Sequence, residues 1–173
     1  MSYFLSQKLG LTKLNLCSAL LLCFLLAGCV SSGTFTPISS TTEPIDSNSA
    51  SYVVVTAPQD RLLEAELAGK IKILLEASRV FQSVTHSNQE SKYELLVQIL
   101  DINKVSMFAK LMLGVFAGSD SVNGMVTLKE VSTNNVIRHF SVEAKGAAHM
   151  LSEEHGMSAA LSELANQIQT GLQ

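Results

Sequence analysis

The sequence predicts an α+β fold, a two-layer sandwich in which one mostly antiparallel sheet of about five strands carries two helices on one face. Two kinds of apolar pattern support this prediction. Short β-branched or alternating segments predict strands, and two longer segments repeat apolar residues at helical spacing. The elements follow one another in the order β-α-β-β-β-β-α, which places a meander of strands between the two helices.

The first strand and the first helix are predicted over residues 52–78. Residues 52–56, Tyr-Val-Val-Val-Thr, are typical of a short buried strand. Thr56 and Gln59 have the spacing of a capping box, with Pro58 in the first helical turn. The helix should then run to about Ser78. The face expected to be buried carries Leu63, Leu67, Ile71, Leu74 and Ser78.

Four further strands are expected between this helix and the last one. They cover residues 81–85, 92–104, 121–131 and 136–146. The segment 92–104 is partly apolar on both faces, which suits a central strand. Residues 132–135, Ser-Thr-Asn-Asn, have turn chemistry and join the last two strands. In the final strand we expect Phe140, Val142 and Ala144 to share the inner face.

The last element is predicted to be a helix from about Ser152 or His155 to Thr170. Gly171 follows it as a plausible C-terminal cap. The expected buried face consists of Met157, Leu161, Leu164, Ala165, Ile168 and Leu172.

Charge and cysteine content exclude several classes of protein. Outside residues 1–28, which contain Lys8 and Lys13, there are ten basic and fifteen acidic residues and no basic block, so nucleic acid is not an expected partner. The three cysteines all lie at or before position 29. A disulfide scaffold and a zinc site built from cysteine are therefore not expected in the rest of the chain.

The amino-terminal segment has the order of features of a secretory signal. Lys8 and Lys13 precede an apolar stretch, residues 16–26, that is broken only by Ser18. As a helix this stretch would span roughly 16 Å, about half of a bilayer core, and so it fits a signal better than a membrane anchor. It ends in Leu26-Ala27-Gly28-Cys29.

This tetrapeptide resembles the lipobox of bacterial lipoproteins. The resemblance implies cleavage between Gly28 and Cys29, a diacylglycerol thioether on the Cys29 sulfur and an acyl chain on its amino group. Two or three acyl chains hold a protein stably on a membrane. No Asp follows the cysteine, since Val30 and Ser31 do, and in this family that implies the outer membrane with the protein facing the periplasm.

Residues 29–51 are expected to be a flexible tether between the lipid and a domain over 52–173. Half of the residues after Cys29 in this segment are Ser or Thr, and Pro37 and Pro44 interrupt it. Such a composition offers little apolar surface to offset the entropy of ordering.

A second resemblance concerns the domain. Its order of elements is similar to the small periplasmic α/β domains of the curli transporter lipoprotein and of lipoprotein activators of penicillin-binding proteins. Residues 113–118, Leu-Gly-Val-Phe-Ala-Gly, and the later turn Val-Ser-Thr-Asn-Asn resemble an uncharacterised outer-membrane lipoprotein family over about residues 90–172. No activity follows from that family.

Residues 107–118 form the one unusual segment. The segment joins two strands, is apolar except for Lys110, and is too long for a tight hairpin. One interpretation is that it packs over the sheet or forms a short helix there. The other is an exposed arm that contacts a partner or the bilayer. The residues expected in that contact are Met107, Phe108, Leu111, Met112, Leu113, Val115 and Phe116.

No pattern of catalytic or metal-ligating residues stands out. His149 and His155 flank two glutamates without ligand spacing, and the stretch 118–121, Gly-Ser-Asp-Ser, lacks a nucleophile frame and is typical of a turn. We therefore expect no enzyme activity, metal or cofactor beyond the acyl chains on Cys29. The hypothesis is a non-catalytic interaction or assembly module of the cell envelope. The alternative is a lipoprotein that holds a lipid or cell-wall glycan between the sheet and the helices.

Overall fold

The computed structural model describes residues 31–40, 43–58, 60–85, 87–147 and 153–173. The strands are β1 (Ser32–Ser40), β2 (Ala50–Thr56), β3 (Ser83–Thr85), β4 (Tyr93–Asn103), β5 (Ser121–Glu130) and β6 (Val136–Lys145). The helices are α2 (Arg61–Ala77), α3 (Met107–Leu113) and α4 (Glu153–Leu172), and the short 3-10 helices are η1 (Asn88–Glu90) and η2 (Gly114–Ala117).

The strands form one mixed sheet in the order β1-β6-β5-β4-β2-β3. The pairs β1–β6, β6–β5 and β5–β4 are antiparallel, whereas β2 runs parallel to both β4 and β3. The predicted fold class is confirmed, with one strand more than expected. The parallel pairing follows from α2, which carries the chain back across the sheet between β2 and β3.

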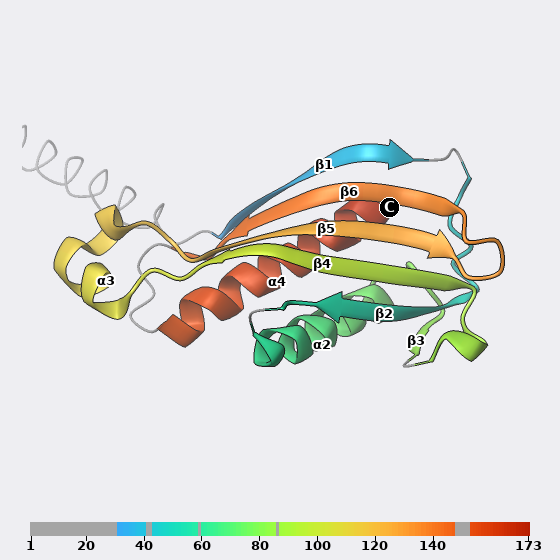
Figure 1. The fold of residues 1–173 in the computed structure, drawn as a ribbon, viewed down its shortest axis with the longest axis horizontal. Helices are drawn as coiled ribbons and strands as arrows, with labels where there is room; N and C mark the ends of the chain where they lie inside the picture. The colour runs from blue at the N-terminus through green and yellow to red at the C-terminus, as the bar shows by residue number, and fades with distance from the viewer. Residues whose placement is uncertain (1–30, 41–42, 59, 86, 148–152) are drawn as a thin grey trace, which may run out of the picture. The chain divides into compact units, whose positions relative to one another are not determined.

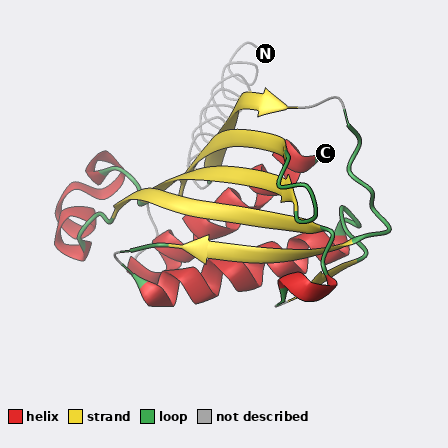
Figure 2. Cartoon of the chain, turned by 45° about the vertical axis from the view of Figure 1, so that its right-hand side comes forward, coloured by secondary structure: helices red, strands yellow, loops and turns green. Residues whose placement is uncertain are grey.

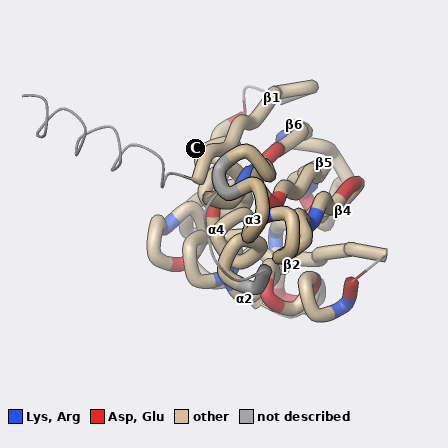
Figure 3. Tube along the Cα trace, turned by 90° about the vertical axis from the view of Figure 1, so that its left-hand side faces the viewer, with Lys and Arg blue, Asp and Glu red and all other residues tan. Residues whose placement is uncertain are grey.

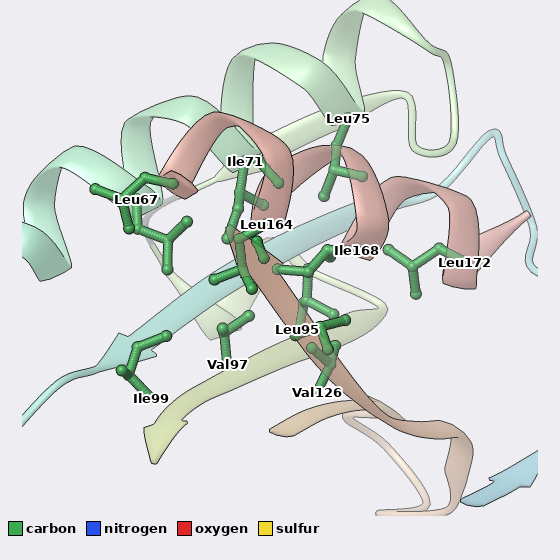
Figure 4. Close-up of a cluster of buried hydrophobic side chains, with 14 of the residues drawn as sticks. Leu67, Ile71, Leu75, Leu95, Val97, Ile99, Val126, Leu164, Ile168 and Leu172 are labelled. Atoms are coloured by element: carbon green, nitrogen blue, oxygen red, sulfur yellow. The ribbon is translucent and has the colours of Figure 1, made fainter. Parts of the chain in front are cut away.

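Both long helices cover the same face of the sheet (Figures 1 and 2). They pack against each other, and α4 also packs against β6, β5 and β1. The core between the layers consists mainly of buried leucine, isoleucine and valine side chains (Figure 4), together with Phe81. Its largest members include Leu67, Ile71, Leu75, Leu95, Leu128, Leu161, Leu164 and Ile168.

The first helix begins one turn later than predicted. Its N-cap is Asp60, whose carboxylate accepts hydrogen bonds from the backbone N–H groups of Leu62 and Leu63. Thr56 ends strand β2, and Gln59 lies outside the described residues. The buried face is also slightly rotated, because Leu75 rather than Leu74 completes the row that includes Leu63, Leu67 and Ile71.

The prediction of a flexible tether over residues 29–51 is wrong for Ser32–Ser40 and for the first residues of β2. The segment Ser32–Ser40 forms β1, which pairs antiparallel with β6 along its length. Phe35 packs edge-on against Phe140, with 6.1 Å between ring centroids. The Ser/Thr-rich composition of this segment gives no strand pattern in the sequence. The strand is stabilised by its pairing with the edge of the sheet at β6.

The remaining elements match their predictions closely. Strands β4, β5 and β6 fall within the predicted ranges, and Phe140, Val142 and Ala144 are buried on the inner face as expected. The expected buried face of α4 is likewise confirmed. Gly171, predicted as a cap, lies inside α4, which continues to Leu172.

Candidate functional site

The candidate site is the connection between β4 and β5, which leaves the sheet as a projecting pair of short helices. Helix α3 follows β4 closely, and η2 precedes β5. Figures 1 and 2 show this pair extending beyond the end of the strands. We refer to residues 107–117 as the apolar arm.

The arm exposes large apolar side chains. Six of the seven residues predicted for a partner or membrane contact are between 55 % and 90 % exposed, with Phe116 the most exposed. The side chain of Val115, the seventh, lies outside what the structure describes. The arm forms a short helix that extends beyond the strands and does not lie over the sheet (Figure 1), so the first interpretation is wrong. Its apolar residues are exposed, as the second interpretation requires, and their contact with a partner or the bilayer stays a prediction. The six exposed residues are Met107, Phe108, Leu111, Met112, Leu113 and Phe116.

Lys110, the single charged residue of the arm, points inward. Its Nζ lies 2.7 Å from Oδ2 of Asp120, and the two side chains are 5 % and 1 % exposed. Figure 3, which faces this end of the protein, shows that α3 and its neighbouring turn contain few charged residues. The arm therefore exposes apolar side chains, and its one charged side chain is buried in an internal ion pair.

Asp120 connects the arm to the ends of the neighbouring strands. Its Oδ1 accepts a hydrogen bond of 2.7 Å from the backbone N–H of Val105, just before α3. Its backbone carbonyl accepts one of 2.8 Å from the N–H of Gly146, just after β6. The carboxylate is therefore satisfied on both oxygens, as a buried ion requires.

Helix α4 closes over this ion pair at a glycine. A Cβ atom on Gly156 would lie 2.1 Å from Oδ2 of Asp120 and 2.9 Å from Nζ of Lys110. A Cβ atom on Gly146 would in turn lie 2.2 Å from the backbone oxygen of Gly156. The close approach of these backbones leaves no space for a side chain at either glycine and helps to bury the ion pair.

The buried ion pair holds the arm in place. Loss of one partner of a buried ion pair costs about 3–5 kcal/mol, because the other charge stays buried without a counter-ion. Movement of the arm away from the sheet would separate the same two charges. The apolar surface is thus attached in a defined orientation rather than on a loose loop.

Sequence reasoning missed Lys110 and Asp120 as a unit. The stretch around Asp120 was expected to be an ordinary turn, and Lys110 was only the exception in an apolar segment. The available signal was that a lone lysine among apolar residues needs a counter-ion if it is buried. Which acid supplies it depends on the register of β4 and β5, and spacing alone does not give that register.

Among the described residues, buried apolar side chains fill most of the layer between the sheet and the helices. A hollow of about 560 Å³ lies beside the amino-terminal ends of α2 and α4, and its lining includes Asp60, Lys104 and His155. The hydrogen bond from Lys104, with that from the Leu63 N–H, holds the pKa of Asp60 below its ordinary value. The Asp60 carboxylate thus binds the Lys104 ammonium through one oxygen and caps helix α2 through the other.

Two other sets of predicted residues have a simple outcome. Gly28 and Cys29, the cleavage and lipidation residues, lie outside the described residues, as does His149. Within the described part of the chain no three His, Cys, Asp or Glu residues are grouped as metal ligands. Among those same residues, no helix has the length and apolarity that crossing a membrane requires.

Comparison with known proteins gives a likeness of fold. No family model matches the sequence, and no curated protein matches it. The PelC dodecamer from Paraburkholderia phytofirmans superposes with a TM-score of 0.59 at 17 % identity, covering 82 % of this chain and 98 % of that one. The chain shares the fold of PelC. A DUF4136 family protein from Bacteroides thetaiotaomicron aligns at a TM-score of 0.46 and 5 % identity, covering 81 % of this chain and 95 % of that one.

Replacing Gly156 with alanine should destabilise the protein by about 1–3 kcal/mol, because the new methyl group overlaps the Lys110–Asp120 pair. Gly69 is the matched control. It also lies within a helix, and a Cβ atom there meets nothing within 4 Å. Gly69→Ala should therefore be neutral or stabilising by up to about 1 kcal/mol. Urea unfolding followed by circular dichroism measures both; equal effects would contradict the packing described here.

Proposed function

We propose that this chain is an outer-membrane-anchored lipoprotein that acts as a non-catalytic interaction or assembly module of the bacterial cell envelope. The observation that carries the proposal is the apolar arm, a fixed surface of six exposed apolar residues. Apolar surface of this kind commonly marks a contact with a protein or a membrane.

The anchor is supported by the sequence of the amino-terminal segment. Basic residues, an apolar stretch of signal length, and small residues before Cys29 occur in the order that lipoprotein processing requires. The lipid would be the protein's attachment to the membrane, and the domain would face the periplasm.

Assembly is supported by the fold and by the sheet edge. PelC, which shares the fold, is described as a dodecamer. Strand β1 here lies at one edge of the sheet, and Ile38 on that edge is 54 % exposed. An edge strand offers backbone groups to a further strand or a partner surface. Self-association or docking through this edge would leave the arm available for a second contact.

The lipid anchor is tested by metabolic labelling with radioactive palmitate. The wild-type chain should be labelled and should sediment with outer membranes. The Cys29→Ser chain should be unlabelled and should keep its full precursor length, because processing needs the modified cysteine. An unlabelled wild-type chain, or a Cys29→Ser chain that is processed normally, would contradict the proposed anchor.

The interaction role is tested by photo-crosslinking in intact cells. A photo-reactive residue at Ile38 should give a defined protein adduct, either a dimer of this chain or a heterologous product. The same residue at Ile73, which is 69 % exposed on α2, serves as the matched control and should give no defined adduct. Only monomer from both positions would count against assembly through the β1 edge.

A further inference from the structure

We infer that the apolar arm seats in the same bilayer leaflet that holds the lipid on Cys29. This inference rests on the proposed anchor and names the arm's partner, the boundary between phospholipid headgroups and acyl chains. The arm would then determine how the domain stands on the membrane. Three observations lead to it: the sheet register, the length of chain before β1, and the chemistry of the arm.

The sheet register brings the start of β1 to the arm. Asn103 at the end of β4 pairs with Ser121 at the start of β5. Ser121 pairs with Lys145 at the end of β6, and Lys145 pairs with Ser32 at the start of β1. These four residues form one row across the sheet. The chain therefore enters β1 at the same end of the sheet from which the arm projects (Figure 1).

The chain between the lipid and this row is short. Cys29 precedes Ser32 by three residues. Three residues reach at most about 10 Å when fully extended. A lipid on Cys29 must then hold this end of the sheet within about 10 Å of the bilayer surface, whereas a tether ending at residue 51 would have allowed any orientation.

The chemistry of the arm fits a bilayer surface. Its exposed residues are Phe, Leu and Met, and its one charge is buried against Asp120. The arm is too short to span a membrane, but apolar side chains on a short helix can enter the upper acyl region while its backbone stays near the headgroups. The buried ion pair holds these side chains outward at the end of the sheet that the lipid brings to the surface.

The experiment uses the lipidated chain reconstituted in vesicles of phosphatidylethanolamine and phosphatidylglycerol. The processed chain would have no free thiol, since Cys29 carries the lipid and the other two cysteines lie in the signal segment. A single cysteine can therefore be placed and labelled with the fluorophore NBD. Leu111→Cys and Phe116→Cys report on the arm. Ile73→Cys on α2 and Val136→Cys at the opposite end of the sheet are matched exposed controls.

At positions 111 and 116 the NBD emission should shift to the blue, and lipids with a doxyl group high on the acyl chain should quench most of it. Positions 73 and 136 should emit as in water and stay unquenched. Aqueous emission at 111 and 116 would overturn the inference, as would a disulfide between two copies at either position in the unlabelled variants. Palmitate labelling of the same preparations separates this failure from that of the anchor, because a labelled chain with an unquenched arm keeps the proposed function.

Discussion

The arrangement of this end of the protein depends on one interaction, the buried ion pair between Lys110 and Asp120. A lysine in an otherwise apolar segment can be buried only if a counter-ion meets it. Asp120 does so at 2.7 Å and also accepts the N–H of Val105. The pair thereby determines the path of the β4–β5 connection. It also requires glycine at position 156, because no side chain fits between helix α4 and the two charges.

Because of this ion pair, the polar and apolar side chains of the arm lie on opposite sides, the charge inside and the apolar groups outside. The ion pair removes the only charge of the arm from its surface, so Phe108, Leu111 and Phe116 remain exposed without a polar neighbour on the same segment. An ordinary loop of this composition would collapse onto the sheet to bury its apolar groups. Here Lys110 is the arm residue whose side chain is buried, and the large apolar side chains are exposed. They lie at the end of the sheet where β1 begins.

The sequence predicts the two-layer fold well because its main elements carry strong periodic patterns. Val97 and Val126 lie in strands with clear alternation, and Leu161 lies in a long amphipathic helix. Strand β1 was missed because its Ser/Thr-rich segment has little apolar content of its own and is ordered by pairing with β6. The composition of residues 107–118 marked the segment as unusual but left open whether its apolar side chains pack over the sheet or are exposed. The ion pair was not anticipated, because Lys110 meets Asp120 only through the register of β4 and β5.

A double-mutant cycle between Lys110 and Asp120 tests most directly whether this pair holds the arm. Lys110→Met and Asp120→Asn should each destabilise the protein by about 3–5 kcal/mol, and together by clearly less than the sum. The exposed pair Lys145–Glu143 provides the reference, for which a coupling of about 0–1 kcal/mol is expected. Coupling above about 2 kcal/mol for the buried pair is the predicted result. Coupling as small as that of the exposed pair would contradict the account.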